Sequence, residues 1–529
     1  MGRAAGVIAK MAYDYQPFPY VRPTGLDRKE HRHKVVIVGA GPIGLAAAIE
    51  LAQHGVASVV LDDNNVVSVG SRAICWSKRS LEILDRLGVG AACLVKGVTW
   101  KVGRTFHGGT EIYNFDLLPE AGHKMPAFVN LQQYYVEEYL VRRALEFPGV
   151  IELRWKNKVV GLVRQTDGVI VEIETPDGTY AIETEWLLAC DGANSDIRRM
   201  MKLHFDGEMF EEKFLIADIE MTADFPSERW FWFEPSFHPG QSALLHKQPD
   251  NIYRIDLQLG WGADANVERQ PERIIPRIEK VVGHSDFRLD WASVYSFRCG
   301  RLANFVHGRV VFVGDSAHVV SPFGARGGNG GLQDVDALCW RLAAIVQGRA
   351  EAEILGHYDA ERCHGSDENI QNSSRTTRFM TPADGIEKTF RDAVLALAHD
   401  CAFARPLVNS GRLSLPCTYP LQNAPDDVRL PACSVPGSVA PDAPIGAGWL
   451  LDQLGGEPTL LILGEGSGQF AGLRQVRADV TPEVRERYLG DLNRAYYLIR
   501  PDQIIAGRWV DLDPDRVQSA IDDIWGKRP

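Results

Sequence analysis

The sequence has 529 residues, of which 45% are hydrophobic and 24% are charged, proportions typical of a globular protein with two or three domains. Its formal net charge is −12, and it contains no run rich in Lys and Arg. Nucleic acids and anionic membrane surfaces are bound through a basic footprint, so this charge balance argues against both as partners.

The nine cysteines are scattered and are never spaced as Cys-x-x-Cys. This pattern favours neither a disulfide framework nor a zinc site, and it fits a reducing compartment. The first thirty residues lack the apolar core of a signal peptide. The longest apolar stretch, residues 35–49, is interrupted by glycines. We therefore expect a cytoplasmic protein without a membrane span.

After an extended arm at residues 1–32, the first predicted unit is strand–turn–helix–strand, over residues 34–63. An apolar run at 34–38 is followed by a G-x-G-x-x-G motif and a helical stretch; its glycines are Gly39, Gly41 and Gly44. Glycines here permit a tight turn, close approach of the backbone to a pyrophosphate, and close packing of helix on strand. The helix N-terminus offers free N–H groups to the phosphates.

An acidic residue ends the second strand of this unit. Asp62 lies 23 residues after Gly39 and can accept hydrogen bonds from ribose hydroxyls. Asp63 is the neighbouring alternative, but strand alternation lets only one of the two point at the ligand, and we choose Asp62. The unit therefore predicts dinucleotide binding; a glycine-rich turn without a ligand is the competing interpretation.

Strand-like patterns dominate residues 150–190 and 205–260. A buried apolar strand at 309–313 then runs into a glycine-rich loop and a helix predicted from about residue 332 to residue 346. Residues 384–402 have a helical pattern. The stretch 405–444 is rich in proline with little periodicity, which indicates a linker before a separate small domain.

Two later motifs distinguish FAD from NAD. The first, WLLACDGANSDIR at residues 186–198, contains Asp191 and Gly192; the second, GRVVFVGDSAHVVSPFGARGGNGG at residues 308–331, contains Gly314 and Asp315. With the G-x-G-x-x-G motif before them, the chain resembles the flavoprotein aromatic hydroxylases, the para-hydroxybenzoate hydroxylase and phenol hydroxylase superfamily. These proteins carry the same three motifs in this order. The resemblance covers residues 30–400 approximately.

The second motif also has a physical rationale. Asp315 follows a buried strand, where a carboxylate can bind a ribitol hydroxyl of FAD; an ordinary helix cap is the alternative. N–H groups of the loop 324–331 can face the flavin edge that becomes anionic on reduction. Ala325 stands where the family usually has a second glycine, and we expect a modest local adjustment there. The expected FAD contacts of this motif are Gly314, Asp315, Pro322, Gly327, Gly328 and Asn329.

The resemblance adds three further FAD contacts. Asp191 matches an aspartate that the family associates with FAD and NAD(P)H, although a structural turn aspartate is an equal alternative. Arg72 matches an arginine placed against the pyrophosphate, and Gln133 matches a glutamine near the ribose. For the last two the alternative is a solvated surface residue.

Within residues 252–259, strand alternation puts Arg254, Asp256 and Gln258 on one face. Such a polar face is either solvated or lines a site, and the family position favours a site. The resemblance places Arg254 near the isoalloxazine and Asp256 on the substrate side. Further candidates to orient or deprotonate a phenol, each of which is more often a structural residue, are Tyr295, His107 and His246.

The resemblance implies an α/β fold: a Rossmann-like FAD-binding domain of the GR2 type with an inserted β-sheet substrate domain, and a C-terminal thioredoxin-like α/β domain. The C-terminal domain has no cysteine after Cys433, so it has a structural or dimerisation role, and a homodimer is one expected assembly. The expected ranges are the arm 1–32; the FAD-binding domain 33–105, 125–203 and 299–403; the substrate domain 106–124 and 204–298; the linker 404–444; and the C-terminal domain 445–529.

The resemblance further implies a single-component monooxygenase that hydroxylates a small phenolic substrate with O₂ through a flavin C4a-hydroperoxide. The sequence has no second Rossmann unit, which the resemblance explains because members of the family lack a separate NAD(P)H domain, and it implies NADH or NADPH as a transient co-substrate. The expected catalytic residues are Arg254, Asp256 and Tyr295. A hydroxyphenylpropionate-like acid is one substrate option. The alternatives are a flavin-dependent reductase or epoxidase acting on a non-phenolic substrate, and a non-catalytic FAD-binding scaffold.

Overall fold

The predicted strand–turn–helix–strand unit is present in the structure, a computed structural model that describes residues 13–260, 262–383, 385–408, 413, 415–466, 470 and 473–527. It consists of β1 (His33–Val38), α1 (Pro42–Gln53) and β2 (Ser58–Asp62), and the two strands are parallel. The neighbours Val36 and Ile37 are both fully buried although they point to opposite faces. The sheet is therefore covered on both sides, which explains the continuous apolar run.

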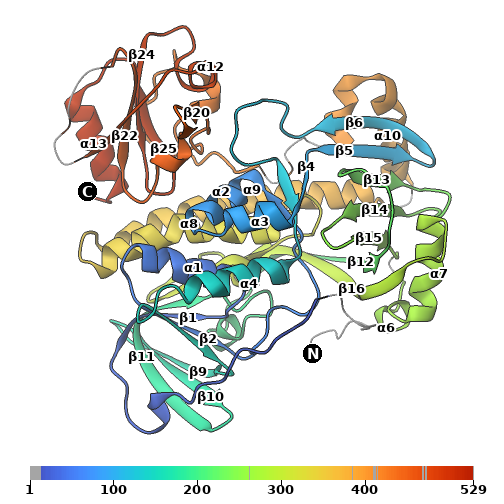
Figure 1. The fold of residues 1–529 in the computed structure, drawn as a ribbon, viewed down its shortest axis with the longest axis horizontal. Coiled ribbons are helices and arrows are strands. Elements are labelled where there is room, and N and C mark those ends of the chain that lie inside the picture. The colour runs from blue at the N-terminus through green and yellow to red at the C-terminus, as the bar shows by residue number, and fades with distance from the viewer. Residues whose placement is uncertain are drawn as a thin grey trace.

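β1 lies at the centre of a sheet whose main path runs β17-β18-β11-β1-β2-β8, with β10 and β9 extending it from β11 (Figure 1). β17 is antiparallel to β18, whereas β8, β2, β1, β11 and β18 run parallel to one another along this path. Their carboxyl ends therefore share one edge, where ligands bind in sheets of this type. The remaining strands are β8 (Ile151–Trp155), β9 (Lys158–Arg164), β10 (Val169–Thr175), β11 (Gly178–Ala189), β17 (Val306–His307) and β18 (Val310–Phe312).

The helix α8 (Gly327–Val346) packs against α1 on this sheet, and α1 also contacts α4 (Gln133–Ala144). The sequence predicts its start near residue 332, whereas it begins at Gly327, because several glycines hide the helical pattern. A Cβ added to Gly331 would lie 2.7 Å from Ile43 Cδ1. Close packing of α8 on α1 thus requires glycine, and this contact is invisible in local propensity.

The second sheet runs β19-β16-β12-β15-β14-β13-β5-β6 and stands beside the first (Figure 1). One face packs against α7 (Pro271–Val282), with Ile255 and Leu257 fully buried there, as the alternation predicts. The sheet already includes residue 102, before the expected boundary at residue 106. Its strands are β5 (Val102–His107), β6 (Thr110–Asp116), β12 (Asp206–Glu220), β13 (Arg229–Phe233), β14 (Ser242–Lys247), β15 (Ile252–Gln258), β16 (Arg288–Arg301) and β19 (His318–Val319).

Shorter elements join the two sheets, and two longer helices follow α8. A three-stranded sheet of order β3-β7-β4 is separate from the two larger sheets. These elements are β3 (Cys75–Ser77), α2 (Lys78–Arg86), α3 (Gly90–Lys96), β4 (Val98–Trp100), β7 (Phe128–Asn130), α5 (Asp196–Met200), α6 (Ala265–Glu268), α9 (Leu355–Met380), α10 (Ile386–Asp400) and α11 (Arg405–Val408).

The C-terminal unit has its own four-stranded sheet, ordered β23-β22-β24-β25. Its core includes Leu430, Ala440 and Ala443, so part of the expected linker belongs to this unit; irregular backbone packs there without any periodicity in the sequence. The elements are β20 (Pro444–Ile445), β21 (Gly448–Trp449), β22 (Thr459–Gly464), β23 (Arg474–Ala478), α12 (Pro482–Val484), β24 (Arg494–Ile499), β25 (Ile505–Trp509) and α13 (Pro514–Ile524).

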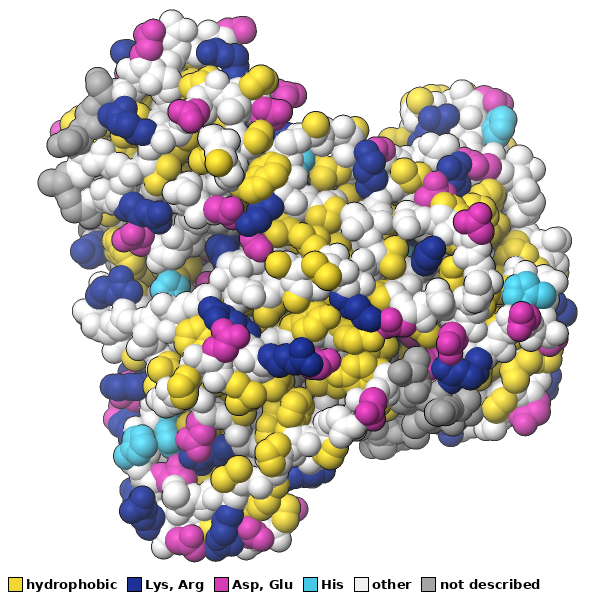
Figure 2. Space-filling view, viewed as in Figure 1, with side chains coloured by type: hydrophobic (Ala, Val, Ile, Leu, Met, Phe, Trp, Pro, Cys, Tyr) yellow, Lys and Arg dark blue, Asp and Glu magenta, His cyan; other side chains and the backbone are white. Residues whose placement is uncertain are grey.

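Charged side chains of both signs are interspersed over the face shown in Figure 2, without an extended area of one sign. This distribution agrees with the absence of a basic run in the sequence. Within the described part of the chain, no helix combines the length and the apolar character needed to cross a membrane.

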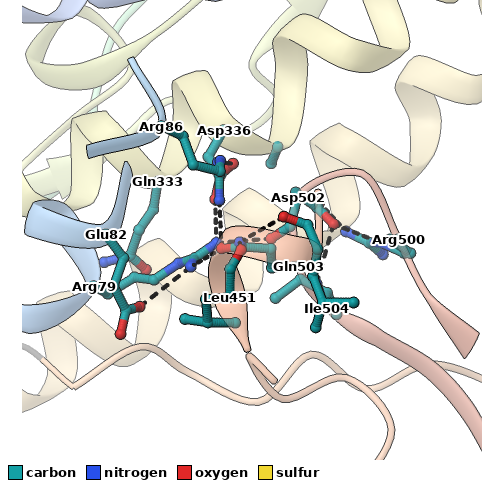
Figure 3. Close-up of polar contacts among 12 residues, drawn as sticks. Arg79, Glu82, Arg86, Gln333, Asp336, Leu451, Arg500, Asp502, Gln503 and Ile504 are labelled. Carbon is teal, nitrogen blue, oxygen red and sulfur yellow. Dashed lines mark hydrogen bonds and ion pairs between the residues drawn. The ribbon is translucent and has the colours of Figure 1, made fainter. Parts of the chain in front are cut away.

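Buried charges attach the C-terminal unit to α2 and α8 (Figure 3). The guanidinium of Arg79 donates to Asp336 Oδ2 (2.6 Å), to the carbonyl oxygen of Asp502 (2.7 Å) and to Gln503 Oε1 (2.8 Å). Arg86 also donates to Asp336 and Gln503. One carboxylate on α8 thus holds two arginines that bind the C-terminal unit.

We expect Asp336→Ala to destabilise the protein by about 3–5 kcal/mol, because removing one partner leaves buried charge uncompensated. The measurement is the free energy of the first unfolding transition in urea. The matched control is Asp511→Ala, whose carboxylate pairs with Arg494 at the surface, and which should change stability by less than about 1 kcal/mol. Equal effects of both substitutions would contradict the assignment.

Candidate cofactor and active site

The turn between β1 and α1 puts its three glycines in different situations. Gly39 has a φ of +105°, a conformation that favours glycine. A Cβ added to Gly44 would lie 1.9 Å from the carbonyl oxygen of Gly39, whereas a Cβ added to Gly41 would meet nothing within 4 Å. The open space at Gly41 adjoins the N-terminus of α1. The turn therefore forms a cradle that fits a pyrophosphate.

Asp62 braces this turn from the end of β2. Its Oδ2 accepts a hydrogen bond from the N–H of Ala40 (2.7 Å), and its Oδ1 accepts one from the N–H of Asn64 (2.7 Å). Each carboxylate oxygen can accept two hydrogen bonds. Bracing the turn is therefore compatible with a ribose hydroxyl as a further partner. The neighbouring Asp63 is exposed.

The N-terminal arm holds the loop that follows β2. The hydroxyl of Tyr15 accepts a hydrogen bond from the N–H of Gly70 (3.0 Å). Phe18 and Asn65 exchange two hydrogen bonds: the N–H of Phe18 donates to the Asn65 carbonyl (2.7 Å), and Asn65 Nδ2 donates to the Phe18 carbonyl (2.9 Å). The arm thus restrains the segment that connects Asp62 to Arg72.

From the other side, α4 holds the same loop through Gln133. Its Oε1 accepts from the N–H of Ala73 (3.1 Å), and its Nε2 donates to Glu137 (2.8 Å). Arg72 between these anchors is exposed, and none of the described residues accepts a hydrogen bond from its side chain. Gln133 therefore shapes the loop, and Arg72 extends from it toward solvent-accessible space.

Asp315 lies after β18, at the N-terminus of α8. A Cβ added to Gly327 would lie 3.8 Å from Asp315 Oδ1. The Asp315 side chain is open to solvent, yet the surrounding protein raises its pKa by desolvation, against the charges of His318 and Arg72. An accessible carboxylate beside the first glycine of α8 fits a ribitol hydroxyl.

The loop before α8 contains one strained residue. Ala325 has a φ of +52°, where a residue other than glycine costs roughly 1–2 kcal/mol; this is the physical form of the predicted local adjustment. Asn329 Oδ1 accepts from the N–H of Ser77 (3.0 Å), and its Nδ2 donates to the Cys75 carbonyl (2.9 Å). An FAD contact of Asn329 therefore has to come from its backbone. Pro322 is exposed on the same loop.

Asp191 follows β11 and organises the turn into α5. Its Oδ2 accepts a hydrogen bond from the N–H of Ile197 (3.0 Å). Burial raises the pKa of Asp191, while the Ser195 side chain lowers it. The Oδ2 contact fits a structural turn residue, whereas the Oδ1, which is buried without a hydrogen-bond partner among the described residues, leaves room for a ligand contact.

The face of the second sheet opposite α7 carries all three predicted catalytic residues. In the strand register, Arg254 pairs with Asp218 and His246. Two residues along β15, Asp256 points to the same side. Farther along, this face becomes apolar and aromatic, with a cluster that includes Tyr113, Phe214, Phe231, Phe233, Leu244, Tyr295 and Phe323. The face therefore combines a charged end with an aromatic surface.

Arg254 connects this face to the cofactor loop. It donates to Asp218 Oδ1 (2.8 Å) and Oδ2 (2.7 Å), and also to the carbonyl oxygens of Ser71 and Arg72. Burial would lower the pKa of Arg254, but Asp218 outweighs this effect and raises it. Because its guanidinium donates to both the second sheet and the loop at residues 71–72, Arg254 acts as a positioning residue between them.

Asp256 is the chemically most available carboxyl on this face. It is half-buried, and its Oδ1 has no hydrogen-bond partner among the described residues. Burial raises its pKa to about 6, against the opposing charge of Arg254. A carboxyl that titrates near neutrality can exchange a proton with a phenol. Tyr295, from β16, is half-buried at the aromatic end of the same face.

The two histidine candidates differ. His246 is buried, and desolvation with the charges of Arg229 and Arg254 lowers its pKa well below the usual value. It is therefore neutral and suited to a structural role. His107 ends β5, where it pairs with Phe233. The structure brings His246 to the charged end of the face and leaves His107 at the β5–β6 turn.

Two residues on this face are not predicted from the sequence. Asp218 is the partner of Arg254, and Arg229 pairs with His246 in the register of β13 and β14. The signal for Asp218 was a single charge in the apolar run of β12. For Arg229, alternation along β13 puts it on the face of Phe231 and Phe233.

Comparison with known proteins agrees with this geometry. A family model described as an FAD-binding domain matches residues 32–373. The 3-(3-hydroxy-phenyl)propionate/3-hydroxycinnamic acid hydroxylase of Mycolicibacterium smegmatis is 26% identical over 68% of this chain and 64% of its own length. The para-nitrophenol 4-monooxygenase of a Pseudomonas species is 28% identical over 62% of this chain and 82% of its own length.

A solved structure extends the similarity to the whole fold. The flavin-dependent monooxygenase PieE, crystallised with FAD and substrate, superposes with a TM-score of 0.80 over 95% of this chain and 100% of its own, at 21% identity. The arrangement of the two sheets and the C-terminal unit is therefore shared with that protein.

We expect Asp315→Ala to weaken FAD binding about ten- to a hundredfold, because a hydrogen bond to a charged group contributes roughly 1.5–3 kcal/mol. The measurement is the FAD content after extensive dialysis. Asp511→Ala, in the C-terminal unit, is the control and should retain FAD. Full retention of FAD by Asp315→Ala would show that this carboxylate does not hold the cofactor.

Tyr15→Phe removes one hydroxyl and leaves the N–H of Gly70 without that acceptor. Because the loop then loses one hydrogen bond, we expect the FAD dissociation constant to rise about two- to tenfold, which corresponds to roughly 0.5–1.5 kcal/mol. Tyr20→Phe, whose hydroxyl donates to Asp177 at the surface, is the matched control. Identical FAD affinity in both variants would mean that the arm does not restrain the loop.

Proposed function

The chain belongs to the FAD-binding family of flavin monooxygenases, and on this premise we propose that it hydroxylates a phenolic ring with O₂ and NADH or NADPH. The observation that carries the proposal is the position of Asp256, a carboxyl of raised pKa at the charged end of an otherwise aromatic face. A face of this composition fits a flat apolar ring with one ionisable oxygen.

The residues of the first sheet fit FAD. The open cradle at Gly41, the braced Asp62 and the accessible Asp315 lie at the carboxyl edge of parallel strands. In the proposal, Gly39, Gly41 and Gly44 admit the pyrophosphate, Asp62 binds the ribose, and Arg72 and Gln133 stand beside them. Asp315, with the N-terminus of α8 at Gly327 and Gly328, holds the ribitol and the flavin end.

When bound, FAD supplies hydride acceptance and oxygen activation. The protein positions the ring and moves the phenol proton. Arg254 fixes the substrate sheet against the loop 71–72, the aromatic residues exclude water, and Asp256 accepts the proton of the phenol. A deprotonated phenol is more electron-rich, so proton transfer to Asp256 favours hydroxylation.

The C-terminal unit is proposed to be a thioredoxin-like domain with a structural role. Its mixed four-stranded sheet, with β22 parallel to β23 and antiparallel to β24, supports this assignment, as does the absence of cysteine after Cys433. The network at Arg79 and Asp336 attaches the unit firmly to the cofactor domain.

The test of the function is a screen of phenols for faster NADH or NADPH oxidation, with identification of the product by mass. A product heavier by one oxygen atom supports hydroxylation. Oxidation of the nicotinamide without an oxygenated product would favour a reductase, and oxygen transfer to a non-aromatic double bond would favour an epoxidase. No oxidation with any phenol would favour a non-catalytic scaffold.

Asp256→Asn keeps the size of the side chain but removes the base. We expect normal FAD content, more hydrogen peroxide per NAD(P)H, and roughly a hundred- to ten-thousandfold slower hydroxylation. Because Asp256 acts in its deprotonated form, the parent rate should rise as pH increases through about 6 and then level off. This rise should be absent in the variant.

The control is Asp250→Asn, a surface carboxylate that pairs with Lys96; its rate and coupling should match the parent enzyme. The measurements are product and peroxide formed per NAD(P)H consumed, from pH 5 to 9 approximately. A parent-like pH profile and rate in Asp256→Asn would remove Asp256 from the mechanism.

A further inference from the structure

Arg229 opens β13 on the substrate face of the second sheet. It pairs across to His246 on β14, which in turn pairs with Arg254 on β15; the three strands are adjacent (Figure 1). Directly opposed residues of antiparallel strands point to the same side. Arg229 is half-buried and therefore faces the same space as Arg254 and Asp256.

The charges around Arg229 leave it without a protein counter-ion. Asp218 is engaged by Arg254 at 2.7 Å, and His246 is neutral because burial lowers its pKa. Among the described residues, no side chain forms an ion pair or hydrogen bond with Arg229. Arg104 on the adjacent β5, by contrast, binds Glu228 at 2.6 Å.

A half-buried guanidinium in this position is unfavourable by itself. Burial lowers the pKa of Arg229, although Cys75 and Asp256 oppose this, and an arginine stays protonated in proteins. Asp256 does not approach within ion-pair distance of it. An external anion would compensate the charge, and the planar fork of arginine suits two oxygens on one carbon.

The spacing of the strands suggests how a ligand would lie. Arg229 and Asp256 are separated by two strand spacings and two residues along the strands, which puts their backbones about 12 Å apart. Both side chains stand on the same face of the sheet, with residues of β14 between them. An aromatic ring with a hydroxyl at one end and an acid at the other has the length to contact both side chains from above this face.

We propose that Arg229 binds the carboxylate of an aromatic acid whose hydroxyl faces Asp256. This inference rests on the proposed function for the aromatic substrate, and it narrows the substrate class to hydroxylated aromatic acids. Arg229 is then a specificity-determining residue, whereas Asp256 performs the proton transfer.

The test uses the FAD-loaded enzyme and two pairs of ligands: 3-hydroxybenzoate with its amide, and 3-(3-hydroxyphenyl)propionate with its amide. Kd is measured from the change in flavin absorbance. In the parent enzyme, at least one acid should bind roughly tenfold more tightly than its amide or better. Arg229→Gln should weaken binding of that acid about ten- to a hundredfold and of its amide less than about threefold.

Arg229→Lys keeps the charge but loses the fork, so its affinity for the acid should fall between those of the parent and Arg229→Gln. Arg104→Gln, on the neighbouring strand, is the matched control and should keep the preference for the acid. FAD content of every variant is measured from the flavin spectrum after dialysis, to confirm that the cofactor site is intact.

Equal affinity of the parent enzyme for acid and amide in both pairs would overturn the inference. An equal loss of both ligands in Arg229→Gln would also overturn it, because that result indicates a structural role. Product formation separates this test from the proposed function. If neutral phenols are hydroxylated without a preference for acids, the proposed function stands and the anion site at Arg229 is wrong. If acids are preferred but no hydroxylated product forms, the anion site stands and the proposed function is wrong.

Discussion

The buried ion pair between Arg254 and Asp218 fixes the geometry on which the active site depends. One guanidinium holds a carboxylate of the substrate sheet and two carbonyl oxygens of the loop at residues 71–72. A buried charge is tolerated only when its hydrogen bonds are satisfied. These hydrogen bonds tie the sheet to the loop, and they place Asp256 and Arg229 relative to it.

The same loop is held from two further directions. Tyr15 and Phe18 restrain it from the N-terminal arm, and Gln133 restrains it from α4. These contacts come from segments far apart in the sequence, which converge because the parallel strands end at one edge. Because protein contacts already order this loop, a cofactor that binds there loses less binding free energy to loop ordering.

Two clusters of buried charge have opposite consequences. Around Asp336 the arginines are paired with acceptors, and this network attaches the C-terminal unit to α2 and α8. On the substrate face, Arg229 lacks such a partner among the described residues, and Asp256 retains a buried oxygen without a hydrogen bond. Satisfied charges in this protein support the fold, whereas incompletely satisfied ones mark the surface proposed to bind substrate.

The sequence by itself determined the cofactor half of the protein. Gly39, Gly44 and Asp62 could be recognised because a phosphate-binding turn is local: one strand, one turn and one helix within thirty residues. The alternation in β15 likewise predicted which face carries Arg254 and Asp256. These features depend on backbone geometry over short distances, and residue spacing records that geometry directly.

Only the tertiary structure decided the roles on the substrate face. The early start of α8 depends on Gly331 packing against Ile43, and the positioning role of Arg254 depends on Asp218, 36 residues away. The proposed anion-binding role of Arg229 depends on strand register and on the absence of a carboxylate paired with it among the described residues. Side-chain partners across strands and loops are set by how the sheets assemble, and no local pattern in the sequence encodes them.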